Sequence, residues 1–562
     1  MLKNKKVLAI VVAIVTLVAV IAVACIAVST SKETKEPVET KPMEQKVENA
    51  ENAKKAFEQM TLAECYQNSE NGEFGGLSTV GENSVQILAK EKNGVSGFML
   101  TKSAVGKILE CGVNEMTFTL NTLAYESGSV PQYVVLDSPV PIDYVVNNEV
   151  AAAKVDGNKL YFAAGTEITI RLEKLYADTT DESGLNFVLL NGDSWESGGT
   201  TAYLILEKLT FVAKLQNLNL DIVTSNDDFT KYYDKESSWA ERTEKAIRAV
   251  ADSGFKYIDL SLYYVRSAAG RNGDLMQDGW KEVVSDLKKL AEELGVEFKQ
   301  AHSPGYPSHG SQEWIDTNKR SIEVCSMLGI ENLVVHAMPC ATKEMFYAYN
   351  LQYYEYILPH AEKYGVNILC ENSTYKNGGT WHINDGVDMR AFIKYVQAQG
   401  YSNFHGCWDT GHGNVEGPQY LDMVGLGDEM YAIHFNDNMG DKDTHLMPYY
   451  GNMNIDEVMN ALKVIGFNGY FTLEASNISD KYTGPELEEG LDPYSTDKFV
   501  QEKISHQIAT HVLNKYDCGT GDQDAVSPNR TFMWIGIEVA ILLIGGSVVA
   551  ALAVKKKKNK ES

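Results

Sequence analysis

Six segments of the chain end in side chains that can bind a metal ion, at intervals of 25 to 40 residues: His302, His336, Glu371, Asp409, His434 and Glu474. A strand, a helix and their connections need about 30 residues or more, so this spacing predicts one such side chain per βα unit. In a closed barrel of eight parallel strands, all carboxyl ends of the strands face one mouth, where the chemistry takes place. The spacing therefore predicts a TIM barrel, (β/α)8, with a metal site at its mouth.

The order of apolar runs and helix signals from Leu218 onward agrees with a barrel. Segments such as LDIVTS, LVVHAM and VNILCEN have the composition of buried strands, and amphipathic segments separate them. Serine before a helical stretch and glycine after it mark helix ends, as in SSWAERTEKAIRAVADSG. We expect eight strands and eight helical segments in a barrel domain over 217–516, with helices at 279–294, 313–328, 343–364, 386–398, 418–424, 454–465 and 496–515.

Residues 58–216 have a different pattern. Short alternating or β-branched runs, such as SVQILAKE and TEITIRLEKLYA, are separated by clusters of Gly, Asn, Asp and Pro. This pattern is typical of an antiparallel sandwich or jelly roll. The predicted fold class is thus an α/β TIM barrel preceded by an all-β sandwich or jelly-roll domain, which is a candidate carbohydrate-binding module.

Both ends of the chain carry apolar runs that are long enough to span a bilayer. Residues 7–28 are uncharged and follow three lysines, so segment 1–28 is a signal peptide or an N-terminal transmembrane anchor. Residues 532–554 form the second run, a predicted transmembrane helix, and the lysine-rich tail 555–562 follows it. Because lysines flank the cytoplasmic side of membrane segments, we expect a cell-membrane protein with its main domains outside the cytoplasm and its C-terminal tail inside.

Two polar segments connect these parts. Residues 29–57 are rich in Lys, Glu, Pro and Thr, and are predicted to form a disordered stalk. Residues 517–531 form a second predicted linker, next to the C-terminal membrane segment.

The charge of the chain limits its partners. The formal net charge is −26 at pH 7. Nucleic-acid binding needs a basic surface that neutralises phosphates, so we expect no nucleic acid as partner. A neutral small-molecule sugar or glycoside meets no such electrostatic barrier.

Four of the predicted strand ends carry a hard, mostly oxygen ligand set: Glu371, Asp409, His434 and Glu474. Three carboxylates and one imidazole suit a divalent cation such as Mn²⁺, Mg²⁺, Co²⁺ or Zn²⁺. A cation of this kind can hold adjacent sugar oxygens and acidify the C–H next to a carbonyl. Glu371 and Glu474 are then the predicted catalytic pair, acting as base and acid on opposite faces of the sugar.

Five more residues are predicted around the same mouth as substrate contacts or ligands of additional metals: His302, His336, His412, Asp443 and His445. His412 comes three residues after Asp409. Asp443 and His445 are two positions apart, so their side chains lie on one side of an extended segment.

The motifs QAHSP, VVHAM, ENS, WDTGH, HFNDN with DTH, and LEAS occur in this order at barrel spacing. Over residues 218–515 the chain thereby resembles the xylose isomerase-like TIM-barrel superfamily, which includes sugar isomerases and epimerases and the type IV AP endonucleases. The resemblance to epimerases implies a metal held by the four-residue set, with His412 on the substrate. The resemblance to the endonucleases implies a trinuclear zinc site that also uses His302, His336, Asp443 and His445.

The resemblance has two departures. The segment after His445 reads MPYYGNMN, where the superfamily often has Pro-Gly-Glu-Gly, and NSTYKNGG after Glu371 lacks a second substrate-binding glutamate. We expect a membrane-anchored, metal-dependent sugar isomerase or epimerase, with a lyase acting on keto-sugars as a related reaction. A zinc phosphodiesterase and a non-catalytic carbohydrate-binding surface protein are the alternatives.

Overall fold

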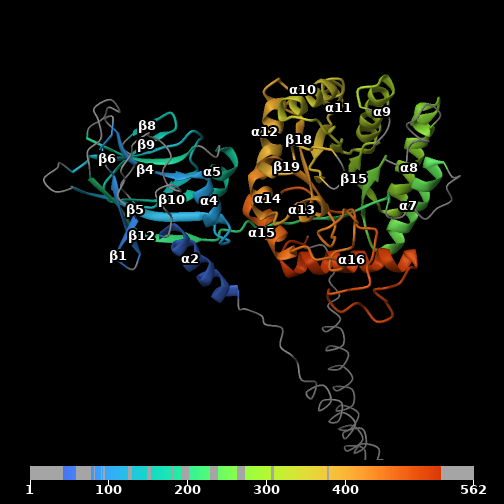
Figure 1. Ribbon diagram of the computed structural model, residues 1–562. Helices are drawn as coiled ribbons and strands as arrows, with labels where there is room; N and C mark the ends of the chain where they lie inside the picture. The colour runs from blue at the N-terminus through green and yellow to red at the C-terminus, as the bar shows by residue number, and fades with distance from the viewer. Residues whose placement is uncertain are drawn as a thin grey trace, which may run out of the picture.

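The computed structural model describes residues 42–58, 77–81, 83–89, 91–92, 95–124, 130–148, 154–179, 183–191, 202–227, 238–262, 273–304, 309–375 and 379–519. They form an all-β domain followed by an α/β barrel (Figure 1). No helix among these residues is both long and apolar enough to cross a membrane. The two predicted membrane segments, 7–28 and 532–554, lie outside the described residues.

The N-terminal domain contains two antiparallel sheets of six strands each. The first has the order β1 (Leu77–Gly81), β2 (Ser84–Ala89), β12 (Ala202–Val212), β5 (Glu115–Ala124), β10 (Thr166–Arg171) and β7 (Tyr144–Val146). The second has the order β3 (Glu91–Lys92), β4 (Val95–Thr101), β11 (Gly184–Leu190), β6 (Tyr133–Asp137), β9 (Lys159–Ala163) and β8 (Lys154–Asp156).

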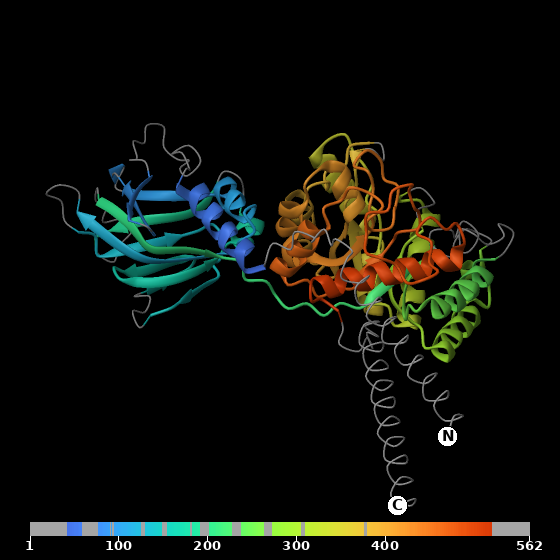
Figure 2. The same ribbon diagram turned by 90° about the horizontal axis from the view of Figure 1, so that it is seen from below.

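The two sheets share one core and lie in separate layers (Figure 2). Phe118 of β5 and Phe187 of β11 are buried with ring centroids 5.7 Å apart, which joins one sheet to the other. Alternate residues of β10 and β12 are buried, as expected for strands with one face on a core. The jelly-roll assignment of this domain stays a prediction.

The prediction of a disordered stalk over 29–57 is wrong for its second half. Residues Pro42–Glu58 form helix α2. Ala53 and Phe57, four positions apart, are fully buried, and the Phe57 ring lies 6.0 Å from that of Phe211 on β12. Two apolar residues on one helix face are too few to stand out in a charged segment, but they are enough to dock the helix onto a sheet.

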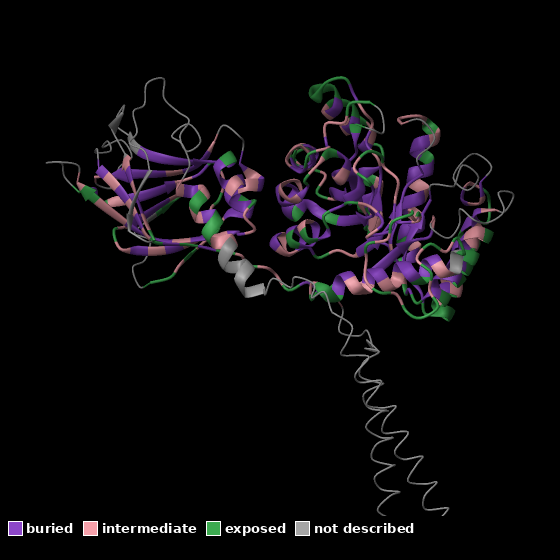
Figure 3. Ribbon diagram, turned by 60° about the horizontal axis from the view of Figure 1, so that its bottom comes forward, coloured by how far each residue is buried: buried purple, intermediate pink, exposed green. Residues whose placement is uncertain are grey.

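The barrel prediction is confirmed. Eight parallel strands pair in chain order, and the last pairs with the first. They are β13 (Ile222–Ser225), β14 (Tyr257–Ser261), β15 (Glu297–His302), β16 (Asn332–Val334), β17 (Asn367–Glu371), β18 (Phe404–Asp409), β19 (Met430–Phe435) and β20 (Phe471–Leu473). These strands are buried inside the ring of helices (Figure 3).

The helices around the barrel are α7 (Trp239–Ser253), α8 (Trp280–Leu294), α9 (Gln312–Leu328), α10 (Lys343–Tyr354), α11 (Leu358–Tyr364), α12 (Gly386–Gln397), α13 (Thr410–Glu416), α14 (Tyr420–Leu426), α15 (Ile455–Ile465) and α16 (Lys498–Lys515). The single helix predicted over 343–364 is two helices, because Pro359 lacks the N–H that a continuous helix requires.

The two domains meet where α5 (Leu172–Asp178) lies against α12 and α14 (Figure 1). The buried Arg390 guanidinium of α12 lies 2.6 Å from Asp178 of α5 and donates to the carbonyl oxygen of Leu426.

At the other end of the barrel domain, the first residues of the predicted linker 517–531 belong to the fold. The amide of Leu220 donates to the carbonyl of buried Cys518, so the linker begins later than predicted.

Candidate metal centre

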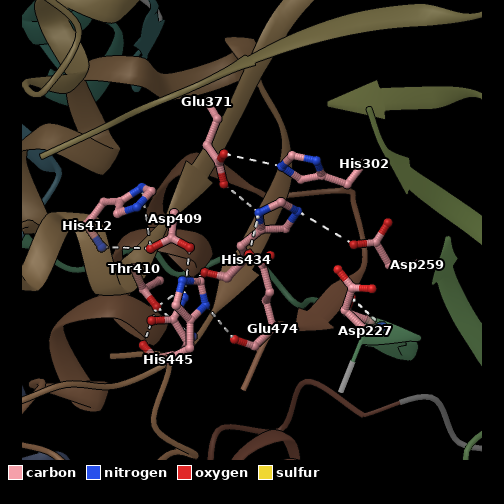
Figure 4. Close-up of polar contacts among 12 residues, drawn as sticks. Asp227, Asp259, His302, Glu371, Asp409, Thr410, His412, His434, His445 and Glu474 are labelled. Atoms are coloured by element: carbon pink, nitrogen blue, oxygen red, sulfur yellow. Dashed lines mark hydrogen bonds and ion pairs between the residues drawn. The ribbon is translucent and has the colours of Figure 1, made fainter. Parts of the chain in front are cut away.

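The barrel places all six spaced residues at one end. His302, Glu371 and Asp409 are the last residues of β15, β17 and β18, and His434 is the penultimate residue of β19. His336 lies two positions after the end of β16, and Glu474 lies one position after the end of β20. Because the strands are parallel, these side chains converge on the C-terminal mouth. Figure 4 shows this convergence for His302, Glu371, Asp409, His434 and Glu474.

The four predicted metal ligands form one cluster. One ligand atom each from Glu371, Asp409, His434 and Glu474 lies within 4.8 Å of all the others. Nδ1 of His434 is 2.5 Å from Oε1 of Glu371 and 3.0 Å from Oε2 of Glu474. Glu371, Asp409 and His434 are buried, whereas the Glu474 side chain is 24% exposed. The cluster is thus open to solvent mainly at Glu474.

The charges in this cluster support one another. Burial opposes ionisation of Glu371, but the neighbouring His434 and His302 outweigh it and hold the pKa of Glu371 well below its usual value. Burial also opposes ionisation of Glu474, yet His434 lowers its pKa to about 2. Both glutamates are therefore carboxylates at neutral pH, the form that binds a cation or accepts a proton.

Asp409 differs from the two glutamates. Burial is the main cause that raises its pKa to about 6. Its side chain caps α13 by accepting from the amide of His412, and its other oxygen accepts from the Asn436 amide at 2.7 Å. These contacts fix the carboxylate at the base of the cluster.

His302 and His336 form a second group around Glu371. Nε2 of His336 lies 2.6 Å from Oε2 of Glu371, and Nε2 of His302 lies 3.0 Å from that of His336. Ligand atoms of these three residues also lie within 4.8 Å of one another. Burial lowers the pKa of His302, but hydrogen bonding and charge from Glu371 raise it to about 9. Glu371 is thus shared between two ligand groups.

The remaining three predicted residues form a third group beyond Asp409. Asp443 lies between two imidazoles, 3.1 Å from Nε2 of His412 and 3.3 Å from Nε2 of His445. The backbone φ of His445 is 46°, which L-residues rarely adopt, and its Nδ1 faces the carbonyl oxygen of Glu474 at 3.0 Å. All nine predicted residues therefore surround one mouth, in three adjoining groups.

Two buried residues near His434 were not predicted. Gln300 precedes His302 by two positions on β15, and its Nε2 lies 3.0 Å from Nε2 of His434. Asp259, on β14, lies 3.7 Å from the same nitrogen. For Gln300 the sequence carried a usable signal. Alternate residues of a strand share one face, so a polar residue two positions before a predicted ligand lies on the same face as that ligand.

The donor set fits a divalent cation. Three carboxylates and one imidazole, held within 4.8 Å, provide the oxygen and nitrogen ligands that Mn²⁺, Mg²⁺, Co²⁺ and Zn²⁺ accept. Three carboxylates around one imidazole carry more negative charge than that imidazole can balance, so their convergence is consistent with a cation site. A separate cavity of about 750 Å³ opens at the opposite end of the barrel, and none of the nine residues lines it.

Comparison with known proteins agrees with the barrel assignment. Residues 247–494 match the family profile described as xylose isomerase-like TIM barrel. The chain is 30% identical over 156 residues to the uncharacterized protein MJ1311 of Methanocaldococcus jannaschii, covering 27% of this chain and 49% of that protein. It is 24% identical over 196 residues to the uncharacterized protein y4fM of Sinorhizobium fredii, covering 33% and 60%. The chain thus spans about half of these two relatives.

Solved structures show a more distant similarity. An L-ribulose 3-epimerase is 16% identical with a TM-score of 0.40, covering 53% of this chain and 96% of the epimerase. A D-tagatose 3-epimerase-like protein is 19% identical with a TM-score of 0.38, covering 53% and 99%. The similarity to this family rests on the profile match over residues 247–494, and the closed barrel of eight parallel strands agrees with it.

Proposed function

We propose that this protein is a metal-dependent sugar isomerase or epimerase. The observation that carries the proposal is the cluster of Glu371, Asp409, His434 and Glu474, whose ligand atoms lie within 4.8 Å of one another at the mouth of the barrel. Substrates of TIM-barrel enzymes bind at this end of the strands. A divalent cation bound there would polarise the sugar carbonyl and acidify the neighbouring C–H bond.

The two glutamates supply the proton transfer. Glu371 and Glu474 come from different strands and both approach Nδ1 of His434, so they border the same small volume. For epimerisation, one carboxylate removes the proton from the carbon next to the carbonyl. The other glutamate, which must first take up a proton from solvent, returns a proton to that carbon from the opposite face. Isomerisation moves the proton between adjacent carbons and uses the same groups.

The setting of the enzyme is part of the proposal. The terminal apolar runs with their flanking lysines support a membrane-anchored protein whose two domains lie outside the cytoplasm. Free sugars or glycosides are then the expected substrates. The all-β domain would bring carbohydrate to the barrel.

A second function is supported by a specific observation. His302, His336 and Glu371 form a second ligand group, and Asp443 lies between His412 and His445 in a third. Three adjoining groups are what a trinuclear zinc phosphodiesterase would need. The net charge of −26 weighs against a nucleic-acid substrate and places this function second.

Metal content decides between these functions. The full chain, purified in detergent, would be analysed by inductively coupled plasma mass spectrometry beside Glu371→Gln/Glu474→Gln. A matched control is Glu292→Gln/Glu331→Gln, at the opposite end of the barrel. One Mn, Mg, Co or Zn per chain, lost only in the first variant, supports the isomerase. Three zincs favour the phosphodiesterase, and protein that cannot be loaded with metal contradicts both.

A deuterium-exchange assay then tests the chemistry. Ketoses and keto-glycosides are incubated with the loaded enzyme in D₂O, and deuterium at the carbon next to the carbonyl is followed by NMR. Incorporation by the wild type and the control variant, but not by the site variant, is the expected result. Loaded enzyme that exchanges no sugar proton contradicts the proposal.

A further inference from the structure

The two ring nitrogens of His434 face different surroundings. Nδ1 faces the carboxylates of Glu371 and Glu474, at 2.5 and 3.0 Å. Nε2 faces the side-chain amide nitrogen of Gln300 at 3.0 Å and Oδ2 of Asp259 at 3.7 Å. His434 is 0% exposed, and Gln300 and Asp259 are each 1% exposed, so water does not compete freely for these contacts.

A neutral imidazole carries one N–H, and a ring nitrogen that binds a cation must be the unprotonated one. For His434 to bind through Nδ1, its Nε2 must therefore carry the hydrogen and needs an acceptor. The amide nitrogen of Gln300 is a donor and cannot be that acceptor. Its oxygen can, and Oε1 of Gln300 is buried with no hydrogen-bond partner among the described residues.

Turning the Gln300 amide by 180° exchanges the positions of its oxygen and nitrogen. This gives the Nε2–H of His434 an acceptor and Oε1 of Gln300 a donor. Oε1 then accepts from the Nε2–H of His434, and Nδ1 presents its lone pair to the cluster. The amide NH₂ moves to the other side and needs an acceptor of its own. Asp259 is the register partner of Gln300 on the neighbouring strand, and its Oδ1 also lacks a partner among the described residues.

We propose that Gln300 is a positioning residue that selects the metal-binding tautomer of His434, with Asp259 holding the turned amide. This inference rests on the metal site of the proposed function and adds a residue to it. A side-chain amide alone can hydrogen-bond either tautomer, but with its NH₂ held by Asp259 it presents only its oxygen to Nε2 of His434 and so favours the tautomer with Nε2–H.

Val334, Leu369, Cys407 and Ala432 form a buried apolar cluster in the barrel, whereas Gln300 and Asp259 are buried polar side chains. Buried polar groups without partners destabilise a fold, and their retention beside a ligand is consistent with a role toward that ligand. The pair therefore contacts the ring nitrogen of His434 that does not face the metal-ligand cluster.

The test measures cobalt binding rather than turnover. The full chain in detergent is titrated with Co²⁺ and followed by the visible absorption of the bound ion, for the wild type, Gln300→Met, Gln300→Glu and the control Thr472→Val. Methionine keeps the size of the side chain but removes the acceptor, whereas glutamate keeps an acceptor. Thr472 of β20 is buried, and its hydroxyl has no hydrogen-bond partner among the described residues.

We expect Gln300→Met to weaken Co²⁺ binding about 10- to 100-fold, the usual effect of losing an outer-shell partner. Gln300→Glu and Thr472→Val should keep the wild-type affinity. Nitrogen-15 shifts of the zinc-loaded wild type should show His434 protonated at Nε2. A scalar coupling across the hydrogen bond should connect this nitrogen with the side-chain carbonyl carbon of Gln300, which a purely structural role would not require.

Wild-type affinity in Gln300→Met, or protonated Nδ1 in zinc-loaded His434, would overturn this inference and leave the metal site intact. A wild type that binds no Co²⁺ would overturn both this inference and the proposed function. If Gln300→Met does not fold, as judged by circular dichroism, the coupling between Nε2 of His434 and the side-chain carbonyl carbon of Gln300 in the wild type decides the matter, and its absence would overturn the inference.

Discussion

Oε1 of Glu371 and Nδ1 of His434 lie 2.5 Å apart, although β17 and β19 are separated by β18 in the barrel. The contact passes over the end of β18, and it places Glu371, which two ligand groups share, against the imidazole of the four-residue cluster. We expect Glu371→Gln to lower kcat by about 10²- to 10⁴-fold, the range for loss of a general acid or base. The fall in kcat is measured as the rate of proton exchange from a ketose, with Glu331→Gln as the control. An unchanged exchange rate in Glu371→Gln would exclude Glu371 from the reaction.

Metal binding should stabilise the fold. A ligand that binds only the folded state at 100 times its Kd adds about 2.7 kcal/mol to the free energy of unfolding. We expect EDTA to lower the Tm of the full chain and Mn²⁺, Co²⁺ or Zn²⁺ to restore it. Differential scanning fluorimetry of the wild type and of Glu371→Gln/Glu474→Gln measures this effect. An equal metal-dependent shift in both proteins would place the binding elsewhere.

Arg390 joins the two domains through a buried ion pair with Asp178. Because hydrogen bonds to charged groups contribute about 1.5–3 kcal/mol, we expect Arg390→Met to destabilise the protein by that amount. The control is Lys343→Met, whose pair with Asp388 is half exposed on both sides and should contribute at most about 1 kcal/mol. Urea unfolding compares the two, and equal effects would show that the domain contact is energetically minor.

Asp422 of α14 should make stability depend on pH. Burial, together with the nearby Asp385 carboxyl, raises its pKa from 3.8 to about 8. The folded protein therefore keeps a proton that the unfolded chain releases, so this contribution to stability is complete below about pH 4 and falls as pH rises toward 8. We expect Asp422→Asn to raise the Tm at pH 8.5 but not at pH 4. The exposed Asp441→Asn serves as control, and a Tm gain that is the same at both pH values would contradict this account.

Helix α2 should be an integral part of the all-β domain. Phe57 is fully buried among Phe98 and Phe211, so we expect Phe57→Ala to cost about 3–5 kcal/mol. The exposed Glu51→Ala should have little effect. Urea unfolding followed by tryptophan fluorescence and circular dichroism tests this, and a neutral Phe57→Ala would restore the stalk interpretation.

The sequence alone determined the barrel and the residues that meet at its mouth. The spacing of one βα unit between His302, His336 and Glu371 can be read directly from the sequence. When parallel strands close into a barrel, their C-terminal ends meet at one mouth, whatever the details of side-chain packing. Glu371, Asp409, His434 and Glu474 could therefore be predicted as one group, and the structure brings them within 4.8 Å.

Only the tertiary structure decided what surrounds each of those residues. The partnership of Gln300 and Asp259 with His434 depends on strand register and stagger, which no local pattern specifies. The docking of Phe57 and the Asp178–Arg390 pair depend on surfaces that form only when distant segments fold against them. Strand and helix periodicity are encoded by neighbouring residues, whereas these contacts join residues that become neighbours only in the folded chain.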